Sequence, residues 1–153
     1  MSSSGAPKIS IDAQGIKVAI LVTSWHTEIT DGLLAGAERA LKTAGNSDYK
    51  VIRVPGAFEL PLAAQGAIES GSEVVIALGV VIRGDTPHFD YVCQAVTSGL
   101  SRVQLDYSIP IGFGVLTVDN EKQALDRAGL EGSKEDKGAE AVEAAIAMKL
   151  LSY

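Results

Sequence analysis

Residues 79–92 read Gly-Val-Val-Ile-Arg-Gly-Asp-Thr-Pro-His-Phe-Asp-Tyr-Val, and this stretch decides the fold of the chain. It begins inside the apolar run Val74–Ile82, which is typical of a buried strand. We expect a turn over Arg83–Thr86 and then a helix that begins at Pro87, with Thr86 as its N-cap. A helix start after a glycine turn presents free backbone N–H groups at the positive end of the helix dipole. The stretch therefore predicts a strand, a turn that can bind an anion, and a helix.

Strands and helices alternate along the rest of the chain. Apolar runs predict strands, and amphipathic segments that follow them predict helices. The expected strands are 17–23, 49–54, 74–82 and 110–117, and the expected helices lie within 26–44, 58–69, 87–105, 121–128 and 139–151. Such alternation is typical of a parallel sheet with helices on both faces. We therefore predict an α/β fold, a three-layer αβα sandwich around a four-stranded, flavodoxin-like parallel sheet.

The two ends of the chain and its composition bound the class of protein. Residues 1–7 read as a flexible tail and residues 8–153 as one domain, in which Ile9 and Ile11 alternate with polar residues as in a short edge strand. The net charge of −6 provides no basic field for nucleic acid. No signal peptide or membrane span is evident, and the single cysteine, Cys93, fits a reducing compartment as a buried packing residue. We expect a soluble, cytoplasmic protein.

The carboxyl ends of the four expected strands should form one site, because ligands bind at that edge of a parallel sheet. The segments that follow the strands are 24–26, 55–57, 83–86 and 116–117. These segments contain the Pro55-Gly56 turn and the Gly84 turn. They include or adjoin the only tryptophan and both histidines of the chain.

His88 and Trp25 are the leading candidates at this edge. His88 follows the anion-binding turn, where an imidazole can exchange a proton near neutral pH; an exposed or capping role is the alternative. Trp25 either fills the core or stacks on a planar heterocycle at the mouth of the site. His26 is expected at the rim.

Other residues have two interpretations each. Glu59 is either a solvated carboxylate of a first helical turn or a ligand for polyol hydroxyl groups. Arg127 is either a surface arginine or a phosphate ligand. Phe113 reads as a core residue, and the polar segment 129–138, with its two lysines, reads as a solvated loop. The motifs of nucleoside triphosphate, dinucleotide and zinc sites are absent, as is a GxSxG nucleophile elbow.

From about Lys17 to Leu150 the chain resembles the lumazine synthase (6,7-dimethyl-8-ribityllumazine synthase) family. Three blocks carry the resemblance in order: Val54–Pro61, Ala77–Val92, and Phe113–Thr117 together with Gln123–Ala128. The resemblance implies condensation of 5-amino-6-(ribitylamino)uracil with 3,4-dihydroxy-2-butanone 4-phosphate, which forms the lumazine precursor of riboflavin and releases phosphate and water. It implies no metal and no organic cofactor.

The resemblance also implies roles for residues. His88 would transfer protons, and Arg127 of an adjacent subunit would join the loop of Gly84, Asp85 and Thr86 in holding the butanone phosphate. Trp25 would stack on the pyrimidine ring. The remaining substrate contacts would come from Ala57, Phe58, Glu59, Val80, Val81, Ile82, Phe113 and Lys137.

Two residues depart from the family pattern. The family often has Phe at the position of Trp25. A tryptophan here preserves stacking but shifts the position of the aromatic ring. Asp85 places a carboxylate beside the expected phosphate, so its side chain must point away and leave only its amide to the ligand.

The resemblance implies a homo-oligomer as well. Lumazine synthases form pentamers, some of which assemble into sixty-subunit icosahedral shells. The length and acidity of 129–138 favour a free pentamer, and Ile9–Asp12 could add an edge strand to the sheet of a neighbouring subunit. Riboflavin synthase is a candidate partner. Two alternatives stay open: an archaeal-type riboflavin synthase, against which the His88 block argues, and a non-catalytic flavin- or lumazine-binding protein.

Overall fold

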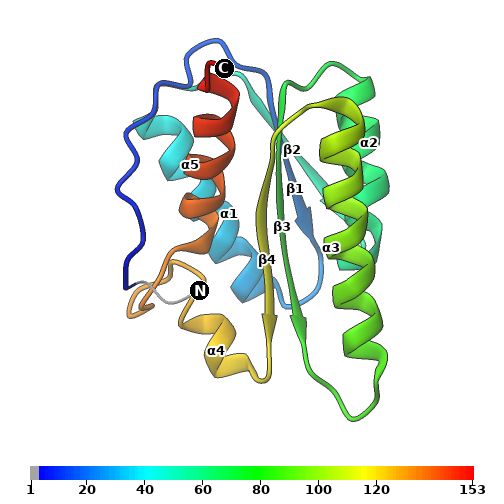
Figure 1. The fold of residues 1–153 in the computed structure, drawn as a ribbon. Coiled ribbons are helices and arrows are strands. Elements are labelled where there is room, and N and C mark those ends of the chain that lie inside the picture. Colours follow the sequence, from blue (N-terminus) through cyan, green and yellow to red (C-terminus); the bar gives the residue numbers. More distant parts are fainter. Residues whose placement is uncertain (1–3) are drawn as a thin grey trace.

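A parallel sheet of four strands in the order β2–β1–β3–β4 lies at the centre of residues 4–153, the part of the chain described by the computed structural model (Figure 1). The strands are β1 (Val18–Thr23), β2 (Tyr49–Val54), β3 (Val74–Ile82) and β4 (Ile111–Val118). The helices are α1 (Thr27–Thr43), the 3₁₀ turn Ala57–Glu59, α2 (Leu60–Glu69), α3 (His88–Tyr107), α4 (Glu121–Leu125) and α5 (Lys137–Leu150). Helices α1 and α5 cover one face of the sheet, and α2 and α3 cover the other (Figure 1). The predicted three-layer α/β fold is confirmed.

The two central strands are apolar on both sides because both faces of the sheet are covered. Every residue of β1 and most of β3 is buried. Ile20 of β1 packs in the cluster under α1 and α5, while the next residue, Leu21, packs in the cluster under α2 and α3. A strand whose successive side chains pack into two cores has a continuous apolar sequence. The apolar runs therefore predicted both β1 and β3 correctly.

Glycines allow α5 to approach its neighbours closely. A Cβ atom on Gly138 would lie 2.0 Å from the carbonyl oxygen of Leu33 in α1. A Cβ atom on Gly112 of β4 would lie 2.4 Å from the carbonyl oxygen of Ala141 in α5. The first turn of α5 is therefore fixed against α1, and this contact also fixes the segment that precedes it.

Several element boundaries differ from the prediction. Helix α3 begins at His88, with Pro87 as its N-cap, and the hydroxyl of Thr86 only accepts a 3.4 Å hydrogen bond from the His88 amide. Helix α4 ends at Leu125, three residues early. Helix α5 begins two residues early, at Lys137, because the carboxylate of Asp136 accepts a 3.1 Å hydrogen bond from the amide of Ala139.

The N-terminal segment forms no strand in this chain. Residues 5–13 have no strand or helix, because alternating apolar residues specify a strand only when a partner strand is present. The predicted tail, residues 1–7, lies partly outside the described residues.

Two residues expected in the core are accessible. Phe113 lies on the edge strand β4 and is 48% exposed, so its assignment to the core was wrong. Cys93 is only half-buried, and partial burial is the main cause that raises the pKa of its thiol. Among residues 4–153, no helix has both the length and the apolar character that crossing a membrane requires.

Candidate functional site

The carboxyl ends of the strands meet at one edge of the sheet, as predicted. The Ser24 hydroxyl after β1 donates a 2.9 Å hydrogen bond to the carbonyl oxygen of Val54, the last residue of β2. The Arg83 amide after β3 donates a 2.9 Å hydrogen bond to the carbonyl oxygen of Val118, the last residue of β4. In Figure 1 the arrowheads of the strands point to this edge, where the connection from β3 to α3 and the helix α4 also lie.

An aromatic and acidic group forms where β1 and β2 end. Trp25 is 66% exposed, so its interpretation as a core residue was wrong. A Cβ atom on Gly56 would lie 3.3 Å from the indole Nε1 of Trp25 and 3.2 Å from a carboxylate oxygen of Glu59. The missing side chain of Gly56 thus lets the indole and the carboxylate lie next to each other. Phe58, which directly precedes Glu59, is 65% exposed, and Ala57 is buried.

The β3–α3 loop, defined here as Arg83–His88, is open to solvent along its whole length. A Cβ atom on Gly84 would meet nothing within 4 Å. The side chain of Asp85 is exposed and has no hydrogen bond or ion pair to any residue of 4–153. His88 is exposed in the first turn of the 20-residue helix α3. The loop can therefore receive a ligand, and few contacts fix its shape.

Arg83 anchors the root of this loop, a role that the sequence did not reveal. Its Nε donates a 2.9 Å hydrogen bond to the carboxylate of Asp119 beyond β4. A guanidinium nitrogen lies 3.7 Å from the carboxylate of Asp90, and the guanidinium carbon lies 4.3 Å from the ring centroid of Phe89. The hydrogen bond to Asp119 raises the pKa of Arg83 further above its usual range. The sequence around Arg83 shows only that Arg83-Gly84 follows a strand. It does not show the partner of Arg83, because Asp119 lies 36 positions away.

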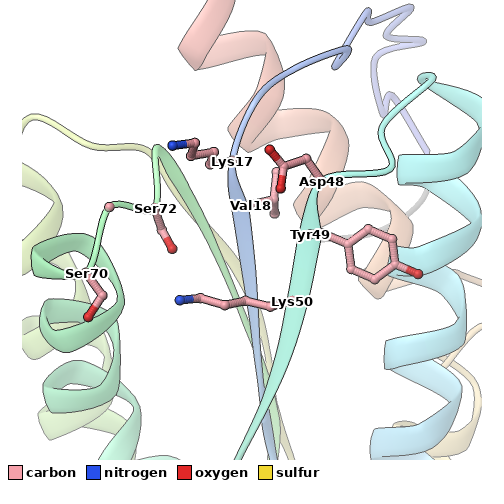
Figure 2. A pocket seen from close by; sticks show the side chains of 8 residues that line it. Lys17, Val18, Asp48, Tyr49, Lys50, Ser70 and Ser72 are labelled. Atoms are coloured by element: carbon pink, nitrogen blue, oxygen red, sulfur yellow. The ribbon is translucent and has the colours of Figure 1, made fainter.

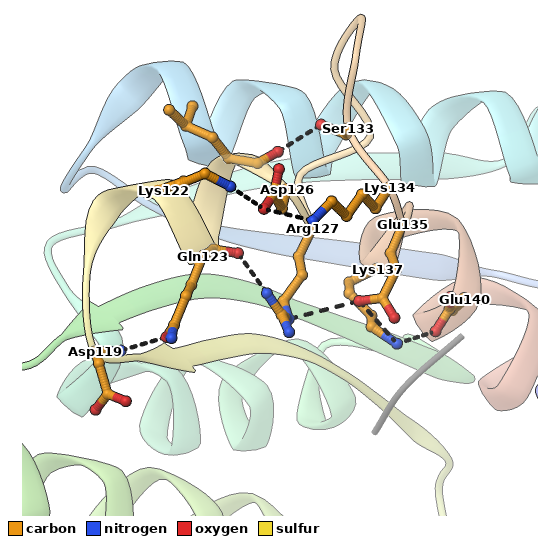
Figure 3. A network of polar contacts seen from close by, with 11 residues as sticks. Asp119, Lys122, Gln123, Asp126, Arg127, Ser133, Lys134, Glu135, Lys137 and Glu140 are labelled. Atoms are coloured by element: carbon orange, nitrogen blue, oxygen red, sulfur yellow. Dashed lines mark hydrogen bonds and ion pairs between the residues drawn. The ribbon is translucent and has the colours of Figure 1, made fainter. Parts of the chain in front are cut away.

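Arg127 and Lys137 lie together in the α4–α5 segment, defined here as residues 126–137 (Figure 3). The Lys137 amide donates a 3.1 Å hydrogen bond to the carbonyl oxygen of Arg127, which places the two cationic side chains next to each other. The Arg127 guanidinium donates a 2.9 Å hydrogen bond to the carbonyl oxygen of Gln123, and Lys137 Nζ lies 2.7 Å from the carboxylate of Glu140. Lys137 is largely buried, so the expectation of a solvated loop was wrong for this residue.

Backbone contacts make the α4–α5 segment a defined structure. The amides of Lys134 and Glu135 both donate to the carbonyl oxygen of Asp126, and an isolated antiparallel bridge joins Ala128 to Asp136. Lys122 hydrogen-bonds to the Asp126 carboxylate and is the main cause that holds the pKa of this carboxyl below its usual value. This polar loop is therefore ordered by its own hydrogen bonds.

The remaining predicted residues occupy different parts of the chain. Val80 is buried, while Val81 and Ile82 are half-buried at the end of β3. Phe113 pairs with Ala77 in the middle of β3, so it lies away from the carboxyl end of β4. Within residues 4–153, no hydrogen bond or ion pair connects Arg127 or Lys137 to the β3–α3 loop. Within one chain, the predicted site residues other than Phe113 therefore form two separate groups: one at the carboxyl ends of β1, β2 and β3, and one in the α4–α5 segment.

Two hollows in the surface lie away from the carboxyl edge of the sheet. One of about 180 Å³ opens at the amino-terminal edge of the sheet, where the side chains of Lys17 and Lys50 point toward Ser70 and Ser72 (Figure 2). Another of about 200 Å³ lies between α3 and β4, and Phe113 contributes to its wall. No group of three His, Cys, Asp or Glu side chains within the described residues is arranged as a metal site.

Comparison with known proteins assigns the chain to a family. The family model described as 6,7-dimethyl-8-ribityllumazine synthase matches residues 15–152. Proteins of that name from Kineococcus radiotolerans and Nocardioides sp. are 60% and 59% identical to this chain, over 95% of it and 91% of each relative. The protein of that name from Leifsonia xyli subsp. xyli is 58% identical over 96% of this chain and 94% of the relative. These matches cover the sheet, the carboxyl edge and the α4–α5 segment, and the chain therefore belongs to the 6,7-dimethyl-8-ribityllumazine synthase family, whose members are transferases of riboflavin biosynthesis.

Proposed function

We propose that this chain condenses 5-amino-6-(D-ribitylamino)uracil with 3,4-dihydroxy-2-butanone 4-phosphate at the carboxyl edge of its sheet. The products are 6,7-dimethyl-8-ribityllumazine, inorganic phosphate and water. The observation that carries the proposal is the exposed His88 at the start of α3, on the same edge as the exposed indole of Trp25. The reaction is inferred from family membership, and the carboxyl edge carries side chains suited to that reaction.

The aromatic and acidic group accounts for binding of the pyrimidine. The indole of Trp25 offers an exposed apolar face on which a planar ring can stack. Glu59, which lies beside it, can accept hydrogen bonds from the hydroxyl groups of a ribityl chain. Ala57 and Phe58 would border this subsite, while Val80, Val81 and Ile82 would meet the ring through their backbone.

The β3–α3 loop would receive the butanone phosphate. Backbone N–H groups of Gly84, Asp85 and Thr86 are available at the positive end of the α3 dipole, where an anion is stabilised. Because the Asp85 side chain is exposed and unpaired within residues 4–153, it is free to turn away from this anion.

Proton transfer would be the task of His88. Imine formation between the amine and the ketone, loss of phosphate and ring closure each move protons, and a positioned imidazole typically accelerates such steps by about 10²–10⁴-fold. Orientation of the two reactants would contribute on the order of 7–11 kcal/mol in favourable cases.

In the oligomer that we propose, Arg127 and Lys137 reach the site of a neighbouring subunit. Its support is that one chain leaves these cations without contact to the β3–α3 loop, as far as residues 4–153 show. Exposed Leu62, Leu105 and Phe113 give α2, α3 and β4 an apolar surface that such a neighbour would cover. We favour a free pentamer in the cytoplasm over a sixty-subunit shell, with Ile9–Asp12 pairing with the sheet of the next subunit and riboflavin synthase as a partner.

The experiment mixes the purified protein with both substrates and follows the fluorescence of the lumazine product against the uncatalysed reaction. Product formation well above that background is expected. A folded oligomer that binds riboflavin tightly without accelerating the condensation would instead identify a flavin-binding protein. Light scattering on the same sample distinguishes a pentamer from a particle near a megadalton.

A further inference from the structure

A buried carboxylate lies beside both cations of the α4–α5 segment. The side chain of Glu135 is only 7% exposed, although it belongs to a polar loop. Its Oε2 atom is fully enclosed and accepts no hydrogen bond from any residue of 4–153. A buried charge without a hydrogen bond is costly, so this carboxylate requires an explanation.

The same oxygen of Glu135 lies near both cations. It lies 3.5 Å from Nε of Arg127 and 3.8 Å from Nζ of Lys137 (Figure 3). Both distances allow ionic attraction but exceed those of charge-assisted hydrogen bonds, which are about 2.7–2.9 Å. Glu135 therefore offsets part of the positive charge of both neighbours while it remains only loosely bound to them.

The backbone, and not these ion pairs, keeps Glu135 in place. The Glu135 amide donates a 2.9 Å hydrogen bond to the carbonyl oxygen of Asp126, and its own carbonyl accepts a 3.0 Å hydrogen bond from the amide of Gly129. Loss of the ion pairs would leave this backbone path intact. The carboxylate can consequently leave the cations without unfolding the segment.

We infer that Glu135 is an internal competitor that sets the anion affinity of the Arg127–Lys137 pair. While no anion is bound, its carboxylate keeps the two cations close together by offsetting their repulsion. An incoming phosphate group, with more charge and more acceptor oxygens, displaces it from them. When phosphate leaves, the carboxylate returns, so the released product is held weakly. This inference rests on the proposed function, in which these two cations contact the phosphate of the substrate.

The test compares Glu135→Gln with the unchanged oligomeric protein, using inorganic phosphate as the probe. Calorimetry gives the dissociation constant of phosphate, and inhibition of the condensation gives a second value. Since the substitution removes the competing charge but keeps the shape, phosphate should bind about three- to tenfold more tightly. Product inhibition should strengthen by the same factor. Unchanged or weaker phosphate binding by a folded Glu135→Gln protein would overturn the inference.

Glu131→Gln is the matched control. Glu131 belongs to the same loop, is exposed, and forms no ion pair with any residue of 4–153. Its substitution changes the net charge equally and should leave phosphate affinity unchanged within about twofold, because an exposed charge is screened. An equal gain in both variants would attribute the effect to general charge and would also overturn the inference.

Two further variants keep the result decisive. If Glu135→Gln does not fold, Glu135→Asp withdraws the carboxylate by one methylene group, and it should strengthen phosphate binding by a smaller factor; no gain would contradict the inference. Arg127→Ala separates the two levels of the proposal. If that variant binds phosphate normally, the proposed phosphate contact fails; if it loses phosphate while Glu135→Gln shows no gain, only the role of Glu135 fails.

Discussion

The β3–α3 loop and the α4–α5 segment are both proposed to hold the same phosphate, yet the chain supports them differently. The β3–α3 loop is exposed from end to end and is tied down mainly at its root by Arg83. The α4–α5 segment is cross-linked by backbone hydrogen bonds and ion pairs, and α5 begins at its end. The cations are thus positioned before the ligand arrives, whereas the loop that carries His88 depends on its anchor, the ligand or a neighbouring subunit for its shape.

The largest effect is expected for His88→Ala. If the exposed loop presents the proton-transfer group, this change should lower kcat by up to about 10²–10⁴-fold without abolishing turnover, because substrate orientation remains. Steady-state kinetics at saturating substrate measures it. His26→Asn is the control: His26 is the other histidine of the chain, it is the N-cap residue of α1, and asparagine tolerates its left-handed backbone, φ 53°. Complete loss of activity in a folded His88→Ala protein that still binds substrate would contradict this division of tasks.

Arg127→Ala tests the positioned cations. Removal of a charge-assisted contact to phosphate should raise the KM for butanone phosphate by about 10–100-fold and change kcat much less. The measurement is the KM of each substrate in turn. Arg102→Ala, which removes an exposed arginine near the far end of α3, should leave both constants unchanged. An unchanged KM for the phosphorylated substrate would remove Arg127 from the site.

The ordered state of the α4–α5 segment should depend on the close contact at Gly138. A methyl group there would overlap the carbonyl oxygen of Leu33, and such overpacking typically costs about 1–3 kcal/mol of unfolding free energy. Gly66→Ala on α2 is the matched control, because a Cβ atom there meets nothing within 4 Å and should stabilise the helix by about 0.5–1 kcal/mol. Denaturant unfolding of both variants measures the difference. Equal stability of the two would mean that the contact does not hold α5 in place.

The smallest effect is expected at the anchor of the loop. Arg83→Ala should lower kcat/KM by about three- to tenfold, because the loop loses its link to Asp119 while its catalytic groups stay present. Arg83→Lys should restore part of this loss, since lysine can pair with Asp119 but does not reproduce the planar stacking on Phe89. Kinetics of both variants, with thermal unfolding as a check on the fold, measures the effect. A loss that lysine does not relieve would argue against the anchoring role.

Sequence patterns located the sheet because its determinants are local. The apolar runs of β1 and β3 and the glycine turn before α3 each indicate structure within a few residues. Phe113 was misplaced because an apolar residue on an edge strand reads like one in the core. The anchor at Arg83 and the burial of Glu135 arise from contacts between distant or irregular segments, which no local period encodes.

In the proposed oligomer, the exposed β3–α3 loop of one chain and the ordered cations of another form one site. Co-assembly of His88→Ala and Arg127→Ala subunits tests this through the condensation rate of the mixed oligomer at a butanone phosphate concentration well below its KM, where each separate variant is slow. With random mixing, about one site in four combines an intact His88 with an intact Arg127 from its neighbour, so about a quarter of the wild-type activity should return. An activity no higher than that of the two separate variants would contradict a site shared between subunits.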